Sequence, residues 1–215
     1  KDGEFLIDKI KPNANHKGTG KLTVETSLNY GFPLPSIFEA FNARVESNYQ
    51  KIWPIDTKNI RIKINPNELK EAIYFSRLST LTQGILFIEY FSKQENLEIK
   101  IEDVMQNWLE GCIIRSDLLK EIKSILKDGP PGRSIVELKQ IQKNLDIRLE
   151  NTKFLLSNCI KNNIPTPVMY SSLNWYINSS SEFNPSSLIQ AQRDYFGAHT
   201  VQLHESDEFL HLNWD

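Results

Sequence analysis

One stretch decides the fold class of this chain: N-P-N-E-L-K-E-A-I-Y-F-S-R-L-S-T-L-T-Q-G-I-L-F-I-E-Y-F-S-K, residues 65–93. Its apolar side chains recur at alternating steps of four and three, which places them on one face of a helix; they are Tyr74, Leu78, Leu81, Ile85 and Ile88. The pair Asn65-Pro66 is a start signal, because proline fits the first turn of a helix. We therefore predict one long helix over 66–93 that forms the spine of an α-helical domain.

Helical spacing continues on both sides of this spine. The further predicted helices cover 20–30, a segment that begins at Ser36, 101–109, 118–126, 135–159 as one long or two abutting helices, 167–177 and 186–196. A firm break falls at D-G-P-P-G, residues 128–132. The chain is thus expected to be all-α.

The last part of the chain differs from the preceding helices in composition and residue pattern. N-S-S-S-E-F-N-P-S-S, residues 178–187, is a polar connector. Beyond the helix at 186–196, apolar and polar residues alternate around a charged centre, which is compatible with two short strands in a β-hairpin. We expect a helical body over 1–177 and an extended tail over 178–215. An isolated hairpin is marginally stable, so the tail should lie against another surface.

The composition of the chain limits the classes of function that it can have. The chain has 215 residues, of which 40% are hydrophobic and 24% charged, as in ordinary globular proteins. The formal net charge of -2 gives no global attraction to nucleic acid or an anionic membrane. No apolar run approaches the roughly 18 residues of a membrane span, and no signal peptide is visible. Cys112 and Cys159 lack metal-ligand spacing, so we expect no metal site but buried free thiols, which suit a reducing cytoplasm.

The first candidate for anion binding is Lys17, in the run H-K-G-T-G-K of residues 16–21. Backbone N–H groups at a helix start attract anions, and glycines allow a ligand to approach closely. The run does not match the nucleotide-binding loop G-x-x-x-x-G-K-[ST]. It also fits a solvated glycine turn with surface lysines, which the pattern alone favours.

Arg44 is the second candidate. It falls on the predicted apolar stripe after Ile37 and Phe41, where a guanidinium needs a carboxylate or phosphate partner to offset its desolvation. Alternatively, Arg44 extends along the edge of the stripe or pairs with Glu39 or Glu46.

Arg193 and His199 are the third, in I-Q-A-Q-R-D-Y-F-G-A-H-T, residues 189–200. Arginine offers a planar fork to phosphate oxygens, and histidine offers a donor that can gain charge near neutral pH. A capping salt bridge and a surface histidine are the structural alternatives. Gly197 is expected to end the helix, so the two side chains need not share a helical face.

Other notable residues are expected to be structural. In G-C-I-I-R-S, residues 111–116, Arg115 is predicted to cap carbonyls and Ser116 the following helix. Trp108, Trp175 and Trp214 are predicted to pack. No Ser-His-Asp arrangement, paired carboxylates or G-x-G-x-x-G after a strand is found, so no catalytic residue is predicted in this chain.

An ordered set of motifs points to a family. These are F-L-I-D-K-I (5–10), K-G-T-G-K (17–21), Ala43-Arg44, Gln83-Gly84, W-x-x-G-C-I-I-R-S (108–116), Ile164-Pro165-Thr166-Pro167 and I-Q-A-Q-R-D-Y-F-G-A-H-T (189–200). Together they resemble the C-terminal all-helical domain of 6-phosphogluconate dehydrogenase, of the long-chain dimeric type. The resemblance runs nearly end to end. Leu22 departs from it, since the family has tryptophan there.

The resemblance implies a reaction and roles. The family's full enzyme oxidises 6-phosphogluconate with NADP, releases CO2 and yields ribulose 5-phosphate. Lys17 and Arg44 match contacts to the substrate phosphate, and Arg193 and His199 match residues that the tail lends to the neighbouring subunit of a homodimer. The general-base lysine, the acid glutamate and the domain that binds most of NADP are absent from this chain, which alone is expected to be inactive. The alternative is a non-catalytic helical module for dimerisation or phosphosugar binding.

Overall fold

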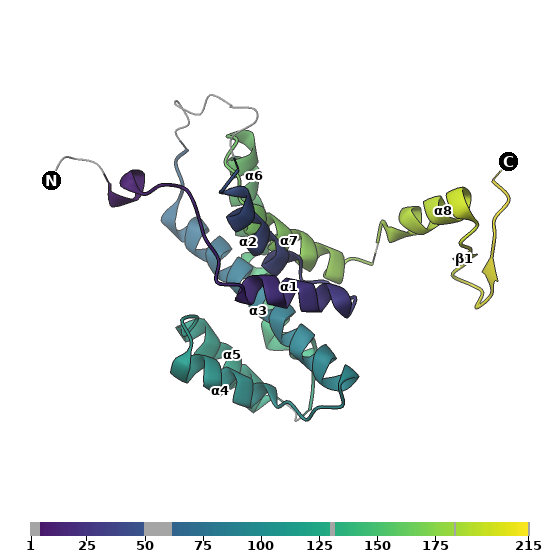
Figure 1. Ribbon diagram of the computed structural model, residues 1–215, viewed down its shortest axis with the longest axis horizontal. Helices are drawn as coiled ribbons and strands as arrows, with labels where there is room; N and C mark the ends of the chain where they lie inside the picture. The colour runs from purple at the N-terminus through teal and green to yellow at the C-terminus, as the bar shows by residue number, and fades with distance from the viewer. Residues whose placement is uncertain (1–4, 50–61, 130–131, 183, 215) are drawn as a thin grey trace. The chain divides into compact units, whose positions relative to one another are not determined.

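The computed structural model describes residues 5–49, 62–129, 132–182 and 184–214. Within these residues the chain is helical apart from one small hairpin, which confirms the all-α prediction (Figure 1). The elements are a 3-10 turn Leu6–Lys9, α1 Thr19–Asn29, α2 Pro35–Glu46, α3 Pro66–Gln94, α4 Ile101–Gly111, α5 Asp117–Asp128, a 3-10 turn Ile135–Glu137, α6 Lys139–Lys161, α7 Pro167–Ser180, α8 Ser186–Gly197, β1 Val201–Gln202 and β2 Phe209–Leu210.

The chain divides into two compact units, Lys1–Tyr176 and Ile177–Asp215. The first holds the long helices. The second holds α8 and the hairpin, in which Val201 pairs with Leu210 and Gln202 with Phe209 in antiparallel register. Each unit therefore presents its own candidate residues, Lys17 and Arg44 in the first and Arg193 and His199 in the second.

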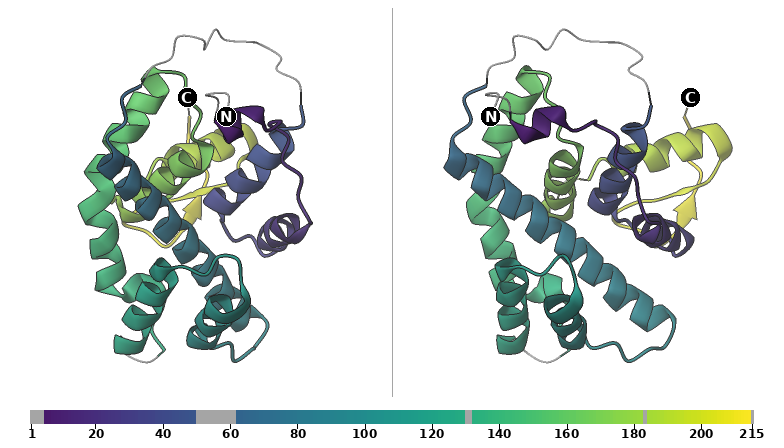
Figure 2. Two further views of the ribbon diagram at one scale, coloured as in Figure 1. Left: turned by 90° about the vertical axis from the view of Figure 1, so that its left-hand side faces the viewer. Right: turned by 60° about the vertical axis from the view of Figure 1, so that its left-hand side comes forward.

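The predicted spine is α3. The side chain of Asn65 caps its start by accepting a hydrogen bond from the Asn67 N–H at 2.9 Å, and Pro66 occupies the first turn. α3 packs along α6, and Figures 1 and 2 show the two helices side by side. The main core forms between α3, α6 and the α4–α5 pair; its fully buried members include Phe75, Leu78, Ile85, Met105, Leu119, Ile122 and Leu156.

A buried polar cluster joins α2 to α3 and α7. The Ser36 N–H donates to Gln83 Oε1 at 3.0 Å, and Gln83 Nε2 donates to Ser36 Oγ at 2.8 Å. The Ser36 and Ser172 hydroxyls lie 3.0 Å apart. Because Leu34, at the N-cap of α2, supplies no capping side chain, Gln83 satisfies the N–H that would otherwise be orphaned. Gln83 thus fixes the start of the helix that carries Arg44.

Several local predictions were wrong. α7 extends three residues beyond 177, into the predicted connector, because the Ser181 N–H still bonds to the Ile177 carbonyl at 2.9 Å. Ser116 occupies the N-cap of α5, but its buried hydroxyl makes no capping bond. The Arg115 side chain is exposed, with no carbonyl partner among the described residues. Pro130 and Pro131 of the predicted break lie outside the described residues.

The cysteines differ in burial, and two of the tryptophans pack as predicted. Both thiols are free, but only Cys159 is buried, whereas Cys112 at the end of α4 is half-buried. Trp108 and Trp175 pack against the main core as predicted.

Of the helices in the described segments, none is both long and apolar enough to cross a membrane. The same segments contain no group of three or more His, Cys, Asp and Glu side chains suited to a metal ion.

Candidate functional site

The start of α1 presents an open set of N–H groups next to Lys17. Gly18 precedes the helix in the left-handed region, at φ 97°, which favours glycine. The first helical hydrogen bond runs from the Leu22 N–H to the Gly18 carbonyl at 2.9 Å, so the N–H groups before Leu22 have no acceptor within the helix. A Cβ built on Gly20 would meet nothing within 4 Å. An anion can therefore reach this helix end, and the exposed Lys17 stands beside it.

The segment before α1 returns to the last turn of α2. The Ala14 N–H donates to Ser47 Oγ at 2.8 Å. The rings of His16 and Phe41 meet edge to face, with centroids 5.3 Å apart. Phe41 lies one helical turn before Arg44 on α2. Lys17 and Arg44 thus belong to neighbouring segments of the first unit.

Arg44 is not buried with the apolar stripe. Ile37 and Phe41 are half-buried, but Arg44 itself is exposed. Its guanidinium forms no ion pair with any described residue, and Glu46 instead accepts a hydrogen bond from Asn42 at 3.0 Å. Desolvation therefore does not demand a partner for Arg44. Among the described residues its guanidinium has no ionic partner, so it is available to a ligand.

The second unit brings Arg193 and His199 together. Both line a cleft of about 390 Å³ with Ile189, Gln192, Phe196 and Gly197. After α8 the chain reverses through two residues with left-handed backbone, Ala198 at φ 49° and Thr200 at φ 62°. This reversal returns His199 to the end of the helix, so the two side chains share a cleft although they do not share a helical face.

Gly197 makes room for the His199 ring. A Cβ built on Gly197 would lie 2.8 Å from both Cδ2 and Nε2 of that ring, closer than real Cβ contacts allow. The backbone of Gly197 is helical, so its φ does not require glycine. A side chain at this position would therefore require the His199 ring to move from where it lies.

Asp194 was not predicted as a site residue, yet it organises the second unit. It is fully buried, and its carboxylate accepts from the N–H groups of Thr200 and Leu212 at 2.7 and 2.9 Å, and from the Trp214 indole at 3.0 Å; His211 Nδ1 lies 2.9 Å away. Burial alone would raise the pKa of Asp194, but these hydrogen bonds lower it to about 2. Asp194 therefore ties α8 to the end of the tail while Arg193, its neighbour, faces the cleft.

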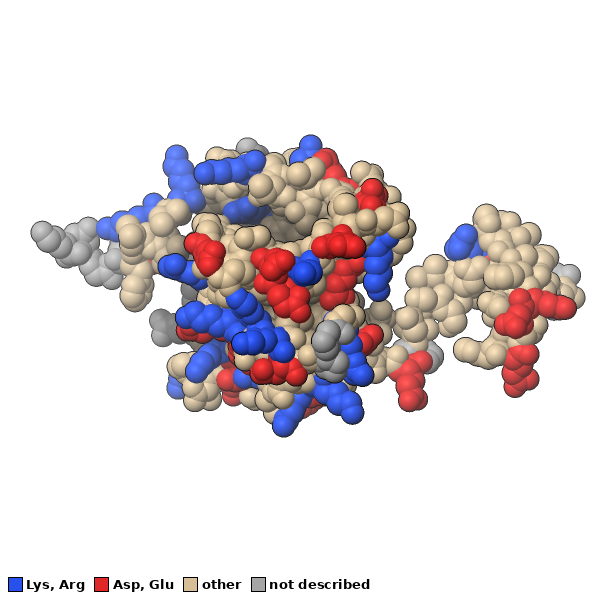
Figure 3. Space-filling view, turned by 90° about the horizontal axis from the view of Figure 1, so that it is seen from below, with Lys and Arg blue, Asp and Glu red and all other residues tan. Residues whose placement is uncertain are grey.

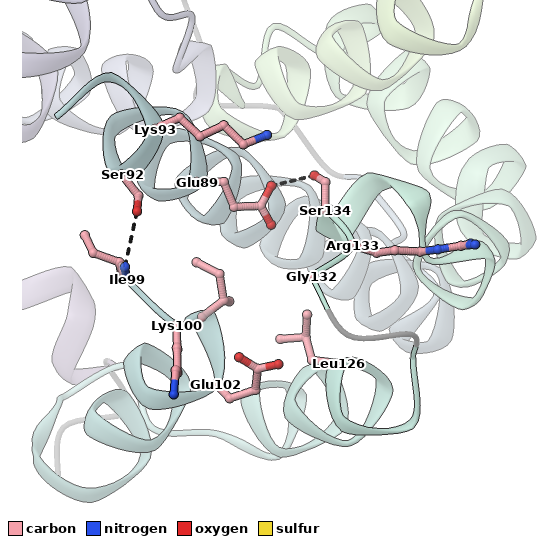
Figure 4. A pocket seen from close by; sticks show the side chains of 11 residues that line it. Glu89, Ser92, Lys93, Ile99, Lys100, Glu102, Leu126, Gly132, Arg133 and Ser134 are labelled. Atoms are coloured by element: carbon pink, nitrogen blue, oxygen red, sulfur yellow. Dashed lines mark hydrogen bonds between the residues drawn. The ribbon is translucent and has the colours of Figure 1, made fainter. Parts of the chain in front are cut away.

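A second cleft in the first unit contains none of the predicted site residues. It has a volume of about 410 Å³ and lies between the end of α3, the start of α4 and residues 132–134 (Figure 4). The Glu89 carboxylate in it accepts from Ser134 Oγ and, at 3.0 Å, from the Ile135 N–H. In Figure 4 the side chains of Lys100 and Arg133 point away from the cavity. Its polar groups hold the chain together at this junction.

The charges on one face of the first unit do not separate by sign. Figure 3 shows cationic and anionic side chains interspersed over one face of the first unit. Anion attraction in this chain is therefore local, as the net charge of -2 indicates.

Comparison with known proteins decides the family. Residues 1–214 match the family model described as "6-phosphogluconate dehydrogenase, C-terminal domain". The chain belongs to this family. As a 6-phosphogluconate dehydrogenase C-terminal domain, it is 32% identical over 221 residues to the decarboxylating 6-phosphogluconate dehydrogenase of Staphylococcus aureus, with 98% of the chain covered. It is 30% identical over 224 residues to the corresponding protein of Ceratitis capitata, with 99% covered.

A solved structure carries the same fold. Plasmodium falciparum 6-phosphogluconate dehydrogenase, solved in its apo form and in complexes with NADP+ and 6-phosphogluconate, matches 98% of this domain with a TM-score of 0.84 and 28% identity. The chain spans about half the length of the relatives it matches: 47% of the two above and 48% of the Plasmodium chain.

Proposed function

We propose that this chain is the substrate-binding and dimerisation domain of a full-length 6-phosphogluconate dehydrogenase. The full-length protein would oxidise and decarboxylate 6-phosphogluconate to ribulose 5-phosphate and CO2 with reduction of NADP, in the cytoplasm. The observation that supports this most is the shared cleft of Arg193 and His199, because it gathers two phosphate-binding groups that the family resemblance assigns to one site.

The four basic residues would bind and orient the substrate phosphate. A dianionic phosphate beside two arginines, a lysine and a histidine gains several charge-assisted hydrogen bonds. Lys17 adds its charge at the start of α1, where N–H groups lack acceptors within the helix, and Arg44 adds a guanidinium that forms no ion pair with the described residues. Holding the remote phosphate would fix the reacting carbon of the sugar acid relative to the catalytic groups of the full-length protein. None of the four is assigned a proton-transfer step, and the chain alone is expected to be inactive.

NADP, which accepts the hydride when bound, does not fit the described residues of this chain. A dinucleotide site of the common type needs a strand followed by a glycine-rich turn and a helix. The described strands, β1 and β2, have two residues each and follow α8 rather than precede a helix. We assign NADP binding mainly to a separate domain of the full-length protein.

The second unit is proposed to lie against a second copy of this chain. Its exposed apolar side chains include Leu188 at 64%, Phe196 at 80% and Phe209 at 72% exposure, which is unusual for a small unit surrounded by water. In the proposed homodimer the tail of one subunit lends Arg193 and His199 to the Lys17 and Arg44 of its partner. This arrangement follows the family resemblance and would cover the apolar surface.

Steady-state kinetics of the full-length protein, followed at the NADPH absorbance band, test the proposal. Arg193→Ala should raise KM for 6-phosphogluconate while leaving KM for NADP nearly unchanged. Arg133→Ala, an exposed arginine of the first unit, is the matched control and should change neither. Equal loss of both affinities would refute the role of Arg193. Binding of 6-phosphogluconate without any turnover by the wild-type protein would favour the non-catalytic module instead.

A further inference from the structure

The side-chain amide of Gln190 joins the two halves of the Arg193–His199 cleft. Its Oε1 accepts a hydrogen bond from Arg193 Nη1 at 3.0 Å, and its Nε2 donates to the Thr200 carbonyl at 2.6 Å. Thr200 directly follows His199 in the chain. We propose that Gln190 is a positioning residue of the phosphate site: it holds the Arg193 guanidinium beside the His199 segment. This inference rests on the proposed function.

Arg193 needs such a restraint. Its side chain is exposed and long, so many rotamers are open to it in water. Within the described part of the chain, Gln190 is the one hydrogen-bond partner found for its guanidinium. The adjacent carboxylate of Asp194 is buried and directed to the tail. Gln190 therefore selects the rotamer that faces the cleft before a ligand arrives, which reduces the ordering needed on binding.

The backbone at Thr200 is held from both sides. Its N–H donates to Asp194 Oδ1 at 2.7 Å, and its carbonyl accepts from Gln190. This residue has φ 62°, an uncommon conformation for a residue with a branched Cβ, which persists only when its surroundings hold it. The two bonds hold the peptides on either side of Thr200 and so restrain the backbone that carries His199.

Glutamine suits this position because it offers an acceptor and a donor on one planar group. The amide oxygen accepts a hydrogen bond from the Arg193 guanidinium, and the amide N–H donates one to the Thr200 carbonyl. A glutamate would present a second oxygen to the carbonyl and would place a negative charge beside the phosphate. A leucine has similar volume but can make neither bond, so Gln190→Leu is the informative change.

A double-mutant cycle in the full-length protein tests the inference. Four proteins are compared by steady-state kinetics: wild type, Gln190→Leu, Arg193→Ala and the double variant. Gln190→Leu alone should raise KM for 6-phosphogluconate on the order of three- to tenfold, with kcat within about twofold and KM for NADP unchanged. In the Arg193→Ala background, Gln190→Leu should raise KM for 6-phosphogluconate by a much smaller factor, because Gln190 acts by positioning Arg193. Gln94→Leu, at the exposed end of α3 in the first unit, is the matched control and should leave all constants unchanged.

The outcomes separate this inference from the proposed function. If Gln190→Leu leaves KM unchanged, or raises it by the same factor in both backgrounds, Gln190 does not act through Arg193 and the inference is overturned. If Arg193→Ala itself leaves KM for 6-phosphogluconate unchanged, the proposed function fails and the inference fails with it.

Discussion

The Oδ1 atom of Asp194 lies 2.7 Å from the amide nitrogen of Thr200 and accepts its hydrogen bond. The same carboxylate accepts hydrogen bonds from the Leu212 N–H and the Trp214 indole N–H at the end of the tail. One buried group thus sets both the chain reversal that carries His199 and the path of the last residues. The cleft that we assign to the substrate phosphate is therefore built on a carboxylate that does not itself face it.

This arrangement predicts an acid-sensitive tail. The pKa of Asp194 in the folded chain is about 2, below its ordinary value of about 3.9, so its stabilising hydrogen bonds are complete above that ordinary value. They are lost as the pH falls from about 4 through about 2. The indole N–H resonance of Trp214 should keep its protection from hydrogen exchange at neutral pH and lose it in this window.

Two comparisons control that experiment. The indole N–H of Trp175, which packs in the first unit, reports general unfolding. Asp194→Asn cannot ionise, so in this variant the protection of Trp214 should be low already at neutral pH. Loss of Trp214 protection in the wild type between pH 5 and 7 would contradict the assignment, since it would indicate a histidine rather than Asp194.

Gly197→Ala is expected to weaken phosphate binding. The added Cβ would come within 2.8 Å of the His199 ring and force it from the helix end. Displacement should raise KM for 6-phosphogluconate in the full-length protein about tenfold, equivalent to about 1.4 kcal/mol. Gly84→Ala is the matched control, because a Cβ there would meet only Ile37 Cδ1, at 3.8 Å. A Gly197→Ala protein with wild-type KM would show that the ring position is irrelevant to binding.

The polar cluster around Gln83 should contribute measurably to stability. Gln83→Leu leaves the buried Ser36 N–H without its acceptor and removes one of the two partners of the Ser36 hydroxyl. We expect the free energy of unfolding to fall by about 1–3 kcal/mol, measured by urea denaturation monitored by circular dichroism. Gln94→Leu, at the exposed end of α3, should stay within about 0.5 kcal/mol of wild type. Equal effects of the two changes would mean that the cluster is not stabilising.

Arg148 should stabilise the contact between α3 and α6. Its Nε lies 2.8 Å from Glu71 Oε2, and its guanidinium carbon lies 3.8 Å from the centre of the Tyr74 ring. Arg148→Met removes both interactions, and we expect a loss of about 1–3 kcal/mol, moderated because Glu71 can be rehydrated. Arg77→Met, on the exposed side of α3, is the control for the same denaturation assay. If Arg148→Met lowers the free energy of unfolding no more than Arg77→Met does, the interactions of Arg148 with Glu71 and Tyr74 have no net stabilising role.

The spine helix was predictable because its apolar residues keep a strict period. What periodicity could not show is that α3 also buries polar residues such as Thr82 and Gln83, which lie off the apolar stripe. Burial there depends on α2 and α7, whose approach is set by long-range packing. The hairpin of the tail could be predicted from alternation, but its register could not.

The candidate site was predicted unevenly for a similar reason. Lys17, Arg44, Arg193 and His199 stand out by residue type and by family resemblance. The exposure of Arg44 depends on where the covering residues end, which one helix cannot reveal. Asp194 makes its contacts across 6 to 20 positions with no repeating spacing, so no local sequence pattern predicts its role.

The sharing of one phosphate site between two subunits is tested most directly by mixing variants of the full-length protein. Arg44→Ala and Arg193→Ala proteins are each purified, unfolded together and refolded so that their subunits exchange. If Arg193 serves the partner, a mixed dimer contains one site with both changes and one intact site. Random mixing should then restore about one quarter of the wild-type rate at a limiting concentration of 6-phosphogluconate, because half of the dimers each hold one intact site of two. A mixture no more active than its two parents would contradict the shared site and place Arg44 and Arg193 of one chain in the same cavity or in none.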